Sequence, residues 1–189
     1  MPELLTDEER QQLLQIARQS IEAAVRQDQL PDLVVESYST TLRELGAAFV
    51  TLTAGGVLRG CIGAIEPYQP LVKDVREHAI AAALKDFRFS PVQVDELLTL
   101  HIEVSRLGLP EPLAYESPQD LLVRIRPGQD GVIFKDGPRR ATFLPQVWEK
   151  LPNPAQFFGM LCQKMGAPPD LWRRKNLEVY IYQVENFHE

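Results

Sequence analysis

Two adjacent glycines, Gly55 and Gly56, separate two β-prone stretches, AAFVTLTA before them and VLRGCIGAI after them. The central residues of a two-residue hairpin turn need positive φ angles, which glycine adopts without steric cost. The pattern therefore predicts an antiparallel hairpin over residues 47–65. This feature constrains the fold more than any other in the chain, because it pairs two strands directly and sets the register between them.

The turn gives an expected register for the hairpin. Its cross-strand pairs are Ala54 with Val57, Leu52 with Arg59, and Val50 with Cys61. Because successive side chains of a strand point to opposite faces, Arg59 and Cys61 are expected on one face and Gly60 on the other. Alternate residues lie about 7 Å apart, so the Arg59 guanidinium is near enough to favour a Cys61 thiolate.

The role of Cys61 stays open on these residues alone. A free cysteine is often a small buried core residue. It is a nucleophile where a nearby cation favours its thiolate. Gly60 and Gly63 weaken a strand, and thereby indicate a bulge or the close approach of another backbone or a ligand. Cys61 is therefore a core residue, a reactive thiol, or part of a ligand pocket that has a glycine floor and Arg59 at its edge.

Hydrophobic periodicity predicts the elements of the N-terminal half. A helix is expected over 6–28, beginning at a capping box formed by Thr6 and Glu9, and a second over 70–85, packed on the hairpin. The alternation in LLTLHIEVSRL (97–107) predicts a strand. One face would carry Leu98, Leu100, Ile102 and Val104, and the other Thr99, His101, Glu103 and Ser105.

The C-terminal half reads as a loop over 108–118, a short helix after Ser117, and a second hairpin that turns at Asp136-Gly137. Helices are expected in PQVWEKL (145–151) and from the Asn153 cap to Gly166, followed by one closing strand over 176–187. Interspersed helices and hairpins predict an α+β fold with a mainly antiparallel sheet, flanking helices and two lobes in a single domain over 1–189.

Composition excludes several classes of protein. A net charge of −6 argues against a nucleic-acid-binding surface, which needs concentrated basic residues. Two cysteines far apart, Cys61 and Cys162, form neither a disulfide framework nor a C-x-x-C motif. The start MPELLTDEER lacks the pattern of a signal peptide, and no apolar run approaches the ~20 residues that span a bilayer. We therefore expect a cytoplasmic protein with no membrane segment, and we assign no oligomeric state.

Other combinations of catalytic or metal-binding residues have weak support. His101, Glu103 and Ser105 share a strand face in steps of about 7 Å, beyond hydrogen-bond reach of one another, so they form no triad by themselves. His101 as a base for Cys61 remains an alternative. The three histidines, at 78, 101 and 188, have no metal-ligand spacing, so no metal site is predicted. Cys162 lies on an apolar helical stripe and is expected in the core.

The segment LRGCIGAIEP (58–67) resembles the signature of the AMMECR domain family. The resemblance continues in order through GAAFVTL, AIAAALKDFRF, IEVSRL, GVIF, ATFLPQVW and LCQKMG, and so covers nearly the whole chain. It implies an α+β protein of two subdomains. The candidate site residues that it implies are Arg59, Gly60, Cys61, Gly63 and Glu66 in the hairpin of 47–67, Asp86, Arg88 and Phe89 in a second block, and Glu103 with Ser105 in a third.

The resemblance implies possible partners but no one activity. Prokaryotic relatives resemble protein A of the AmmeMemoRadiSam system, whose genes lie beside those of a Memo-like protein and a radical SAM protein. Two hypotheses follow. In one, Cys61 attacks or binds a small electrophilic molecule with the help of Arg59 and Glu66, or the hairpin binds a small anion through Arg59 and backbone N–H groups. In the other, the chain is a non-catalytic adaptor for those partners. No cofactor is assigned.

Overall fold

The hairpin lies where the glycine pair predicts it. In the computed structural model, which describes residues 4–189, β1 (Leu45–Ala54) and β2 (Val57–Gly63) are antiparallel neighbours. Gly55 and Gly56 have φ angles of 57° and 79°, the left-handed geometry that the turn requires.

The register departs from the expectation beyond the first pairs. The observed pairs are Ala54 with Val57, Thr53 with Leu58, Leu52 with Gly60, and Thr51 with Cys61. Arg59 is thus the extra residue of a β-bulge, and its predicted pairing with Leu52 is wrong, as is the pairing of Cys61 with Val50. Because a shift of one residue exchanges the two faces of a strand, the bulge moves Cys61 from the face of Val50 to that of Thr51.

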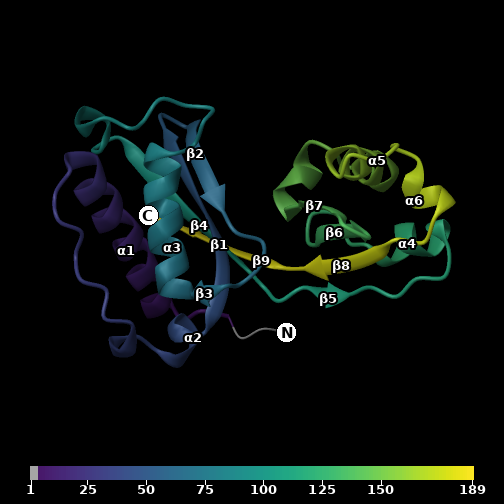
Figure 1. Cartoon of the computed structure of the whole chain (residues 1–189), viewed down its shortest axis with the longest axis horizontal. Helices are drawn as coiled ribbons and strands as arrows, with labels where there is room; N and C mark the ends of the chain where they lie inside the picture. The colour runs from purple at the N-terminus through teal and green to yellow at the C-terminus, as the bar shows by residue number, and fades with distance from the viewer. Residues whose placement is uncertain (1–3) are drawn as a thin grey trace. The chain divides into compact units, whose positions relative to one another are not determined.

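The first of two units consists of the chain up to Leu107 together with Glu185–Glu189. Its sheet has the order β2-β1-β4-β9, with β4 at Leu100–Leu107 and β9 at Val184–His188; the short β3 (Gln69–Pro70) pairs with the start of β1. The two long helices of this unit, α1 (Asp7–Arg26) and α3 (Leu71–Leu84), cover one face of the sheet (Figure 1).

The core of unit 1 lies between that face and the two helices. Alternate residues of β1 and β4 supply the sheet side: Ala48, Val50, Leu52, Leu100, Ile102 and Val104. The apolar stripe of α3 is also buried: Leu71, Val75, Ala79, Ala82 and Ala83. Leu98 does not belong to this set, because the strand begins only at Leu100 and the Leu98 side chain is 95% exposed.

Local capping signals locate the helix ends of unit 1. Thr6 and Glu9 form the predicted capping box, and α1 ends where Gln27 adopts a left-handed conformation. The connector before β1 contains η1 (Val35–Ser37) and α2 (Thr40–Arg43), and the segment between α3 and β4 contains η2 (Val94–Glu96).

Unit 2 spans Gly108–Val184. Its sheet has the order β5-β8-β6-β7, with strands β5 (Glu111–Pro112), β6 (Gly131–Asp136), β7 (Arg139–Phe143) and β8 (Glu178–Tyr182). Its helices are α4 (Pro118–Arg124), η3 (Pro145–Glu149), α5 (Pro154–Lys164) and α6 (Leu171–Arg174). The hairpin turn is at Gly137-Pro138 rather than Asp136-Gly137, because Asp136 pairs with Arg139.

Aromatic side chains fill the core of unit 2. Trp148 stacks on Phe157 with ring centroids 3.6 Å apart, and Phe134 lies 5.3 Å from Phe158. Cys162 is buried in this cluster, as its helical stripe predicts. Asn153 caps α5 as predicted, and Ser117 caps α4, the short helix expected after it. Gly166 follows α5 with a φ of 76°.

The closing segment forms two strands instead of the one predicted over 176–187. β8 belongs to the sheet of unit 2 and β9 to the sheet of unit 1, with Gln183 between them. No glycine or proline marks this division in the sequence. The fold is nonetheless of the predicted α+β class: β1 pairs antiparallel with β2, β3 and β4, and β6 pairs antiparallel with β7 and β8.

Candidate functional site

The sheet of unit 1 has a second face, opposite α1 and α3, which we call the outer face. It carries the alternate residues of β1, β2 and β4: Phe49, Thr51, Thr53, Cys61, His101, Glu103 and Ser105. Three of these side chains form a row across the strands, because Thr51 pairs with Cys61 on one side and with Glu103 on the other. The bulge at Arg59 is what brings Cys61 into this row.

The Cys61 thiol is partly accessible and has a hydrogen-bond donor beside it. The Thr51 hydroxyl donates to Sγ of Cys61 over 3.3 Å. The second cysteine differs, since Cys162 is fully buried and burial raises the pKa of its thiol.

The backbone of Cys61 is held by the segment that follows α3. Its N–H donates to Oδ2 of Asp86 over 2.9 Å, and its carbonyl accepts from the Arg88 guanidinium over 3.2 Å. Arg88 also pairs with Asp86 at 2.6 Å, and the Asp86 side chain is only 2% exposed. The Arg88 guanidinium and, after it, the Cys61 N–H hold the pKa of Asp86 well below its usual range.

Arg59 has a different partner from the one expected. It forms a two-pronged ion pair with Glu96, at 2.7 and 3.0 Å, and donates to the Ser90 carbonyl. This pairing raises the pKa of Arg59 and lowers that of Glu96. Arg88, rather than Arg59, is the arginine that contacts Cys61, through a hydrogen bond to its backbone carbonyl.

The motif glycines allow close packing. A Cβ on Gly60 would lie 2.2 Å from the Ala82 carbonyl oxygen of α3, so the glycine lets the helix approach the bulged strand. A Cβ on Gly63 would lie 2.5 Å from the Ala48 carbonyl oxygen and 2.4 Å from the Phe49 ring. Both positions thus need glycine for packing within unit 1.

The remaining candidates are spread around this row. Ser105 pairs with Phe49 and is buried, whereas His101 pairs with Thr53 and is exposed. Glu66 lies exposed in the loop after β2. Glu103 is therefore the ionisable candidate in the same row as Cys61, and His101 is one row further along.

Two partners of the site were not predicted. Thr51 lies on the outer face because it alternates with Phe49 and Thr53 along β1. Its position beside Cys61 depends on the bulge, which sequence alone does not locate. No sequence pattern indicated a role for Glu96, because its ion pair with Arg59 joins segments that are distant in the sequence. His78, near the motif in sequence, pairs through Nδ1 with the buried Asp74 at 3.1 Å on α3.

Within residues 4–189, no group of three or more His, Cys, Asp and Glu side chains is arranged to hold a metal ion. Over the same residues, no helix combines the length and the apolar character needed to cross a membrane.

Comparisons with known proteins agree with this fold. The family model described as AMMECR1 matches residues 14–187. A protein of Methanothermobacter thermautotrophicus is 41% identical over 197 aligned positions, covering 98% of this chain and 96% of that protein. Protein MJ0810 of Methanocaldococcus jannaschii is 37% identical, covering 83% of this chain and 80% of its own. The crystal structure of the uncharacterized protein PH0010 from Pyrococcus horikoshii is similar with a TM-score of 0.86 and 34% identity, covering 98% and 93% of the two chains.

Proposed function

The chain belongs to the AMMECR1 family, and we propose that it binds a small electrophilic molecule at Cys61 on the outer face of the unit 1 sheet. The observation that carries this proposal is the row of Cys61, Thr51 and Glu103, in which the thiol receives a hydrogen bond from Thr51. A partly accessible thiol with a donor beside it is suited to nucleophilic attack.

A carbonyl compound fits this arrangement. The Cys61 thiol would first lose its proton to water. Its sulfur would then form a bond with the carbonyl carbon as the carbonyl electron pair moves to oxygen, and that oxygen would take a proton back from water to give a hemithioacetal. Thr51 would stabilise the thiolate before attack, since its hydroxyl donates to sulfur. Glu103, opposite Thr51, would exchange a proton with a group bound above this row.

Binding of an anion at the hairpin has less support. It relied on Arg59 and on free backbone N–H groups, but Arg59 is paired with Glu96 and the Cys61 N–H donates to Asp86. Glu103 adds a negative charge to the same row. An uncharged electrophile is therefore favoured over a phosphate or carboxylate.

The first test is alkylation by iodoacetamide at neutral pH, with each cysteine followed by peptide mass spectrometry. Cys61 should react much faster than the buried Cys162. Thr51→Val removes the donor to sulfur without changing the side-chain shape, and should slow the reaction of Cys61 by about fivefold, the rate equivalent of one hydrogen bond. Thr53→Val, on the same strand and face, is the matched control and should leave the rate unchanged.

Equal and slow labelling of both cysteines would refute a reactive thiol, and equal effects of the two threonine variants would refute the role of Thr51. The cellular test compares metabolites in cells with and without the gene. An electrophile that accumulates should bind the protein, and Cys61→Ser should abolish that binding while thermal stability is retained.

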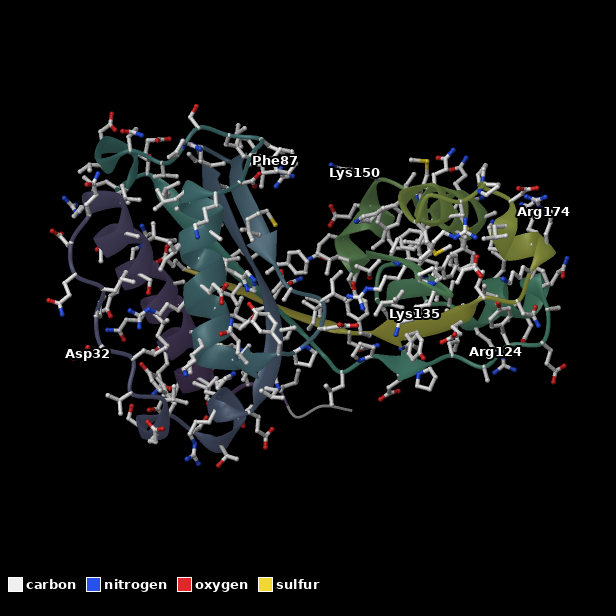
Figure 2. The ribbon with its side chains drawn as sticks, viewed as in Figure 1. Asp32, Phe87, Arg124, Lys135, Lys150 and Arg174 are labelled. Atoms are coloured by element: carbon white, nitrogen blue, oxygen red, sulfur yellow. The ribbon has the colours of Figure 1, made fainter. Side chains whose placement is uncertain are left out.

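A second candidate function is docking of a partner protein, which exposed apolar side chains on unit 1 favour. Phe87, just beyond α3, is 94% exposed (Figure 2), and Leu98, before β4, is 95% exposed. Memo-like and radical SAM proteins are the partners that the family resemblance suggests. Replacing Phe87 and Leu98 by glutamate should abolish co-purification with such a partner, whereas Val123→Glu on unit 2, a comparably exposed site, should not. Unchanged co-purification by the double variant would count against docking here.

A further inference from the structure

Unit 2 contains a groove that the Cys61 site does not use. It has a volume of about 570 Å³ and runs between α5 and α6. Its lining extends to Leu151, two residues after the end of η3. Its apolar lining comes from Leu151, Ala155, Met160, Pro169 and Trp172. Pockets of this volume accommodate drug-sized ligands. We call it the α5–α6 groove.

The groove follows from the pattern of α5. One side of this helix is buried in the aromatic core of unit 2: Phe157, Phe158, Leu161 and Cys162. The other side faces the groove and has Gly159 where a larger side chain would occupy the space. Next to it, Met160 is 46% exposed and leaves a flexible apolar surface for a ligand.

Three polar side chains that form no ion pair or hydrogen bond within residues 4–189 border this apolar surface: Arg173, Gln156 and Gln163. Arg173 lies over the Trp172 ring, with its guanidinium carbon 4.8 Å from the ring centroid. Among residues 4–189, no carboxylate forms an ion pair with Arg173, and the side-chain amides of Gln156 and Gln163 form no hydrogen bonds. The one carboxylate in the lining, Asp170, is already paired with Arg174 at 2.9 Å.

We propose that the α5–α6 groove binds an amphipathic anion, a molecule with an apolar aromatic or aliphatic body and one carboxylate or sulfonate group. The body would lie on Met160 and its apolar neighbours, and the anionic group would accept hydrogen bonds from Arg173. A guanidinium that lies over an aromatic ring still presents the N–H groups at its edge, which can bind a carboxylate with two parallel hydrogen bonds. The proposal is independent of Cys61, since every residue involved belongs to unit 2.

The test uses two fluorescent probes with the full chain. The anionic probe is 8-anilinonaphthalene-1-sulfonate, and the neutral one is N-phenyl-1-naphthylamine, which has a closely similar apolar body. Both should bind with saturable fluorescence at one site. Octanoate, a simple amphipathic anion, should displace the anionic probe, whereas acetate, which lacks the apolar body, should not.

Three variants locate the site. Arg173→Gln should weaken binding of the anionic probe by about fivefold, the upper range for an exposed ion pair, and leave the neutral probe unaffected. Arg26→Gln, at an exposed arginine of unit 1, makes the same change in net charge and should affect neither probe. Gly159→Leu should block both probes, because it places a side chain in the groove.

The Gly159→Leu protein is expected to fold. A Cβ at this position would lie 3.4 Å from the nearest atom, the Pro169 carbonyl oxygen, which is ordinary contact, and leucine favours a helix more than glycine does. Its melting temperature should therefore be at least that of the parent chain. The proposal is overturned if Gly159→Leu binds the anionic probe normally, if Arg173→Gln and Arg26→Gln have equal effects, or if no saturable binding occurs.

Discussion

Asp86 shows how one buried carboxylate completes the edge of a sheet. β2 is an edge strand, and the backbone of Cys61 points away from β1, towards the segment after α3. Asp86 accepts the N–H of Cys61 and Arg88 donates to its carbonyl, so the two side chains provide what a neighbouring strand would provide. An edge covered in this way is protected from pairing with other chains. The motif residues at 86 and 88 thus hold the backbone of Cys61 in place.

This role predicts a specific dependence of stability on pH. Because the pKa of Asp86 is lowered in the folded protein, chiefly by the Arg88 guanidinium, its contribution to stability is complete above the ordinary aspartate pKa of about 4. That contribution is lost as the pH falls below 4 towards the folded-state pKa. Asp86→Asn should therefore lower the free energy of unfolding at pH 7 by about 1–3 kcal/mol and flatten the decline in acid. Urea titrations from pH 7 to pH 3 measure both effects.

The matched control for Asp86→Asn is Asp95→Asn, at an exposed aspartate on η2. This variant should have the stability and the acid sensitivity of the parent chain. If Asp86→Asn shows the same acid slope as the parent chain, the carboxylate does not stabilise the edge by its charge.

The packing of α3 on β2 is set by Gly60. The Ala82 carbonyl oxygen occupies the place where a Cβ of residue 60 would lie, and a carbonyl of the helix backbone cannot move aside as a flexible side chain does. Close packing here brings the end of α3 to the bulged strand and allows Asp86 to reach Cys61. The glycine of the motif therefore has a structural function that needs no ligand.

Gly60→Ala should destabilise unit 1 by about 1–3 kcal/mol, the usual cost of overpacking, and lower the melting temperature by about 3–10 °C. Gly159→Ala on α5 is the control. There the added Cβ has room and improves the helix propensity, so the melting temperature should rise or stay constant. Thermal unfolding followed by circular dichroism makes the comparison. Equal melting temperatures for Gly60→Ala and the parent chain would show that α3 is not held by this contact.

Elements set by local chemistry were predictable from the sequence. The Gly55-Gly56 turn, the Thr6 capping box and the Asn153 cap each depend on a few neighbouring residues, and all three are present. Gly60 and Gly63 indicated a bulge or a close approach, but the sequence did not locate the bulge at Arg59, because its position depends on the fit between β2 and α3. That single extra residue decides the site, since without it Cys61 would share the face of Val50 in the core.

The candidate site was predicted as a set of residues but not as an arrangement. Cys61 and Glu103 do share a row, through Thr51. Arg59 was assigned to the thiol because two residues of a regular strand share a face, and the bulge removes that regularity. Its ion pair with Glu96 joins segments distant in sequence, and local patterns carry no information on such pairs.

At the scale of the whole chain, unit 1 is discontinuous. The chain leaves it after Leu107, forms unit 2, and returns with Glu185–Glu189 to add β9 beside β4. The returning segment is tied to α1: Glu185 pairs with Arg10 at 2.8 Å, and Glu189 pairs with Arg18. Unit 2, in contrast, is one continuous segment with its own aromatic core. The two units should therefore respond differently to loss of the C-terminus.

Removal of residues 185–189 should destabilise unit 1 and leave unit 2 folded. The deletion takes away Phe187, which is 7% exposed in the unit 1 core, and both carboxylates that pair with α1. Truncation of a buried phenylalanine alone costs about 3–5 kcal/mol. Hydrogen exchange by mass spectrometry should show lost protection in α1 and β4 and retained protection in α5. Phe187→Leu, which keeps most of the apolar volume, is the control and should preserve protection in α1. Loss of protection throughout both units in the truncated chain would mean that unit 2 depends on unit 1, against the separation of their cores.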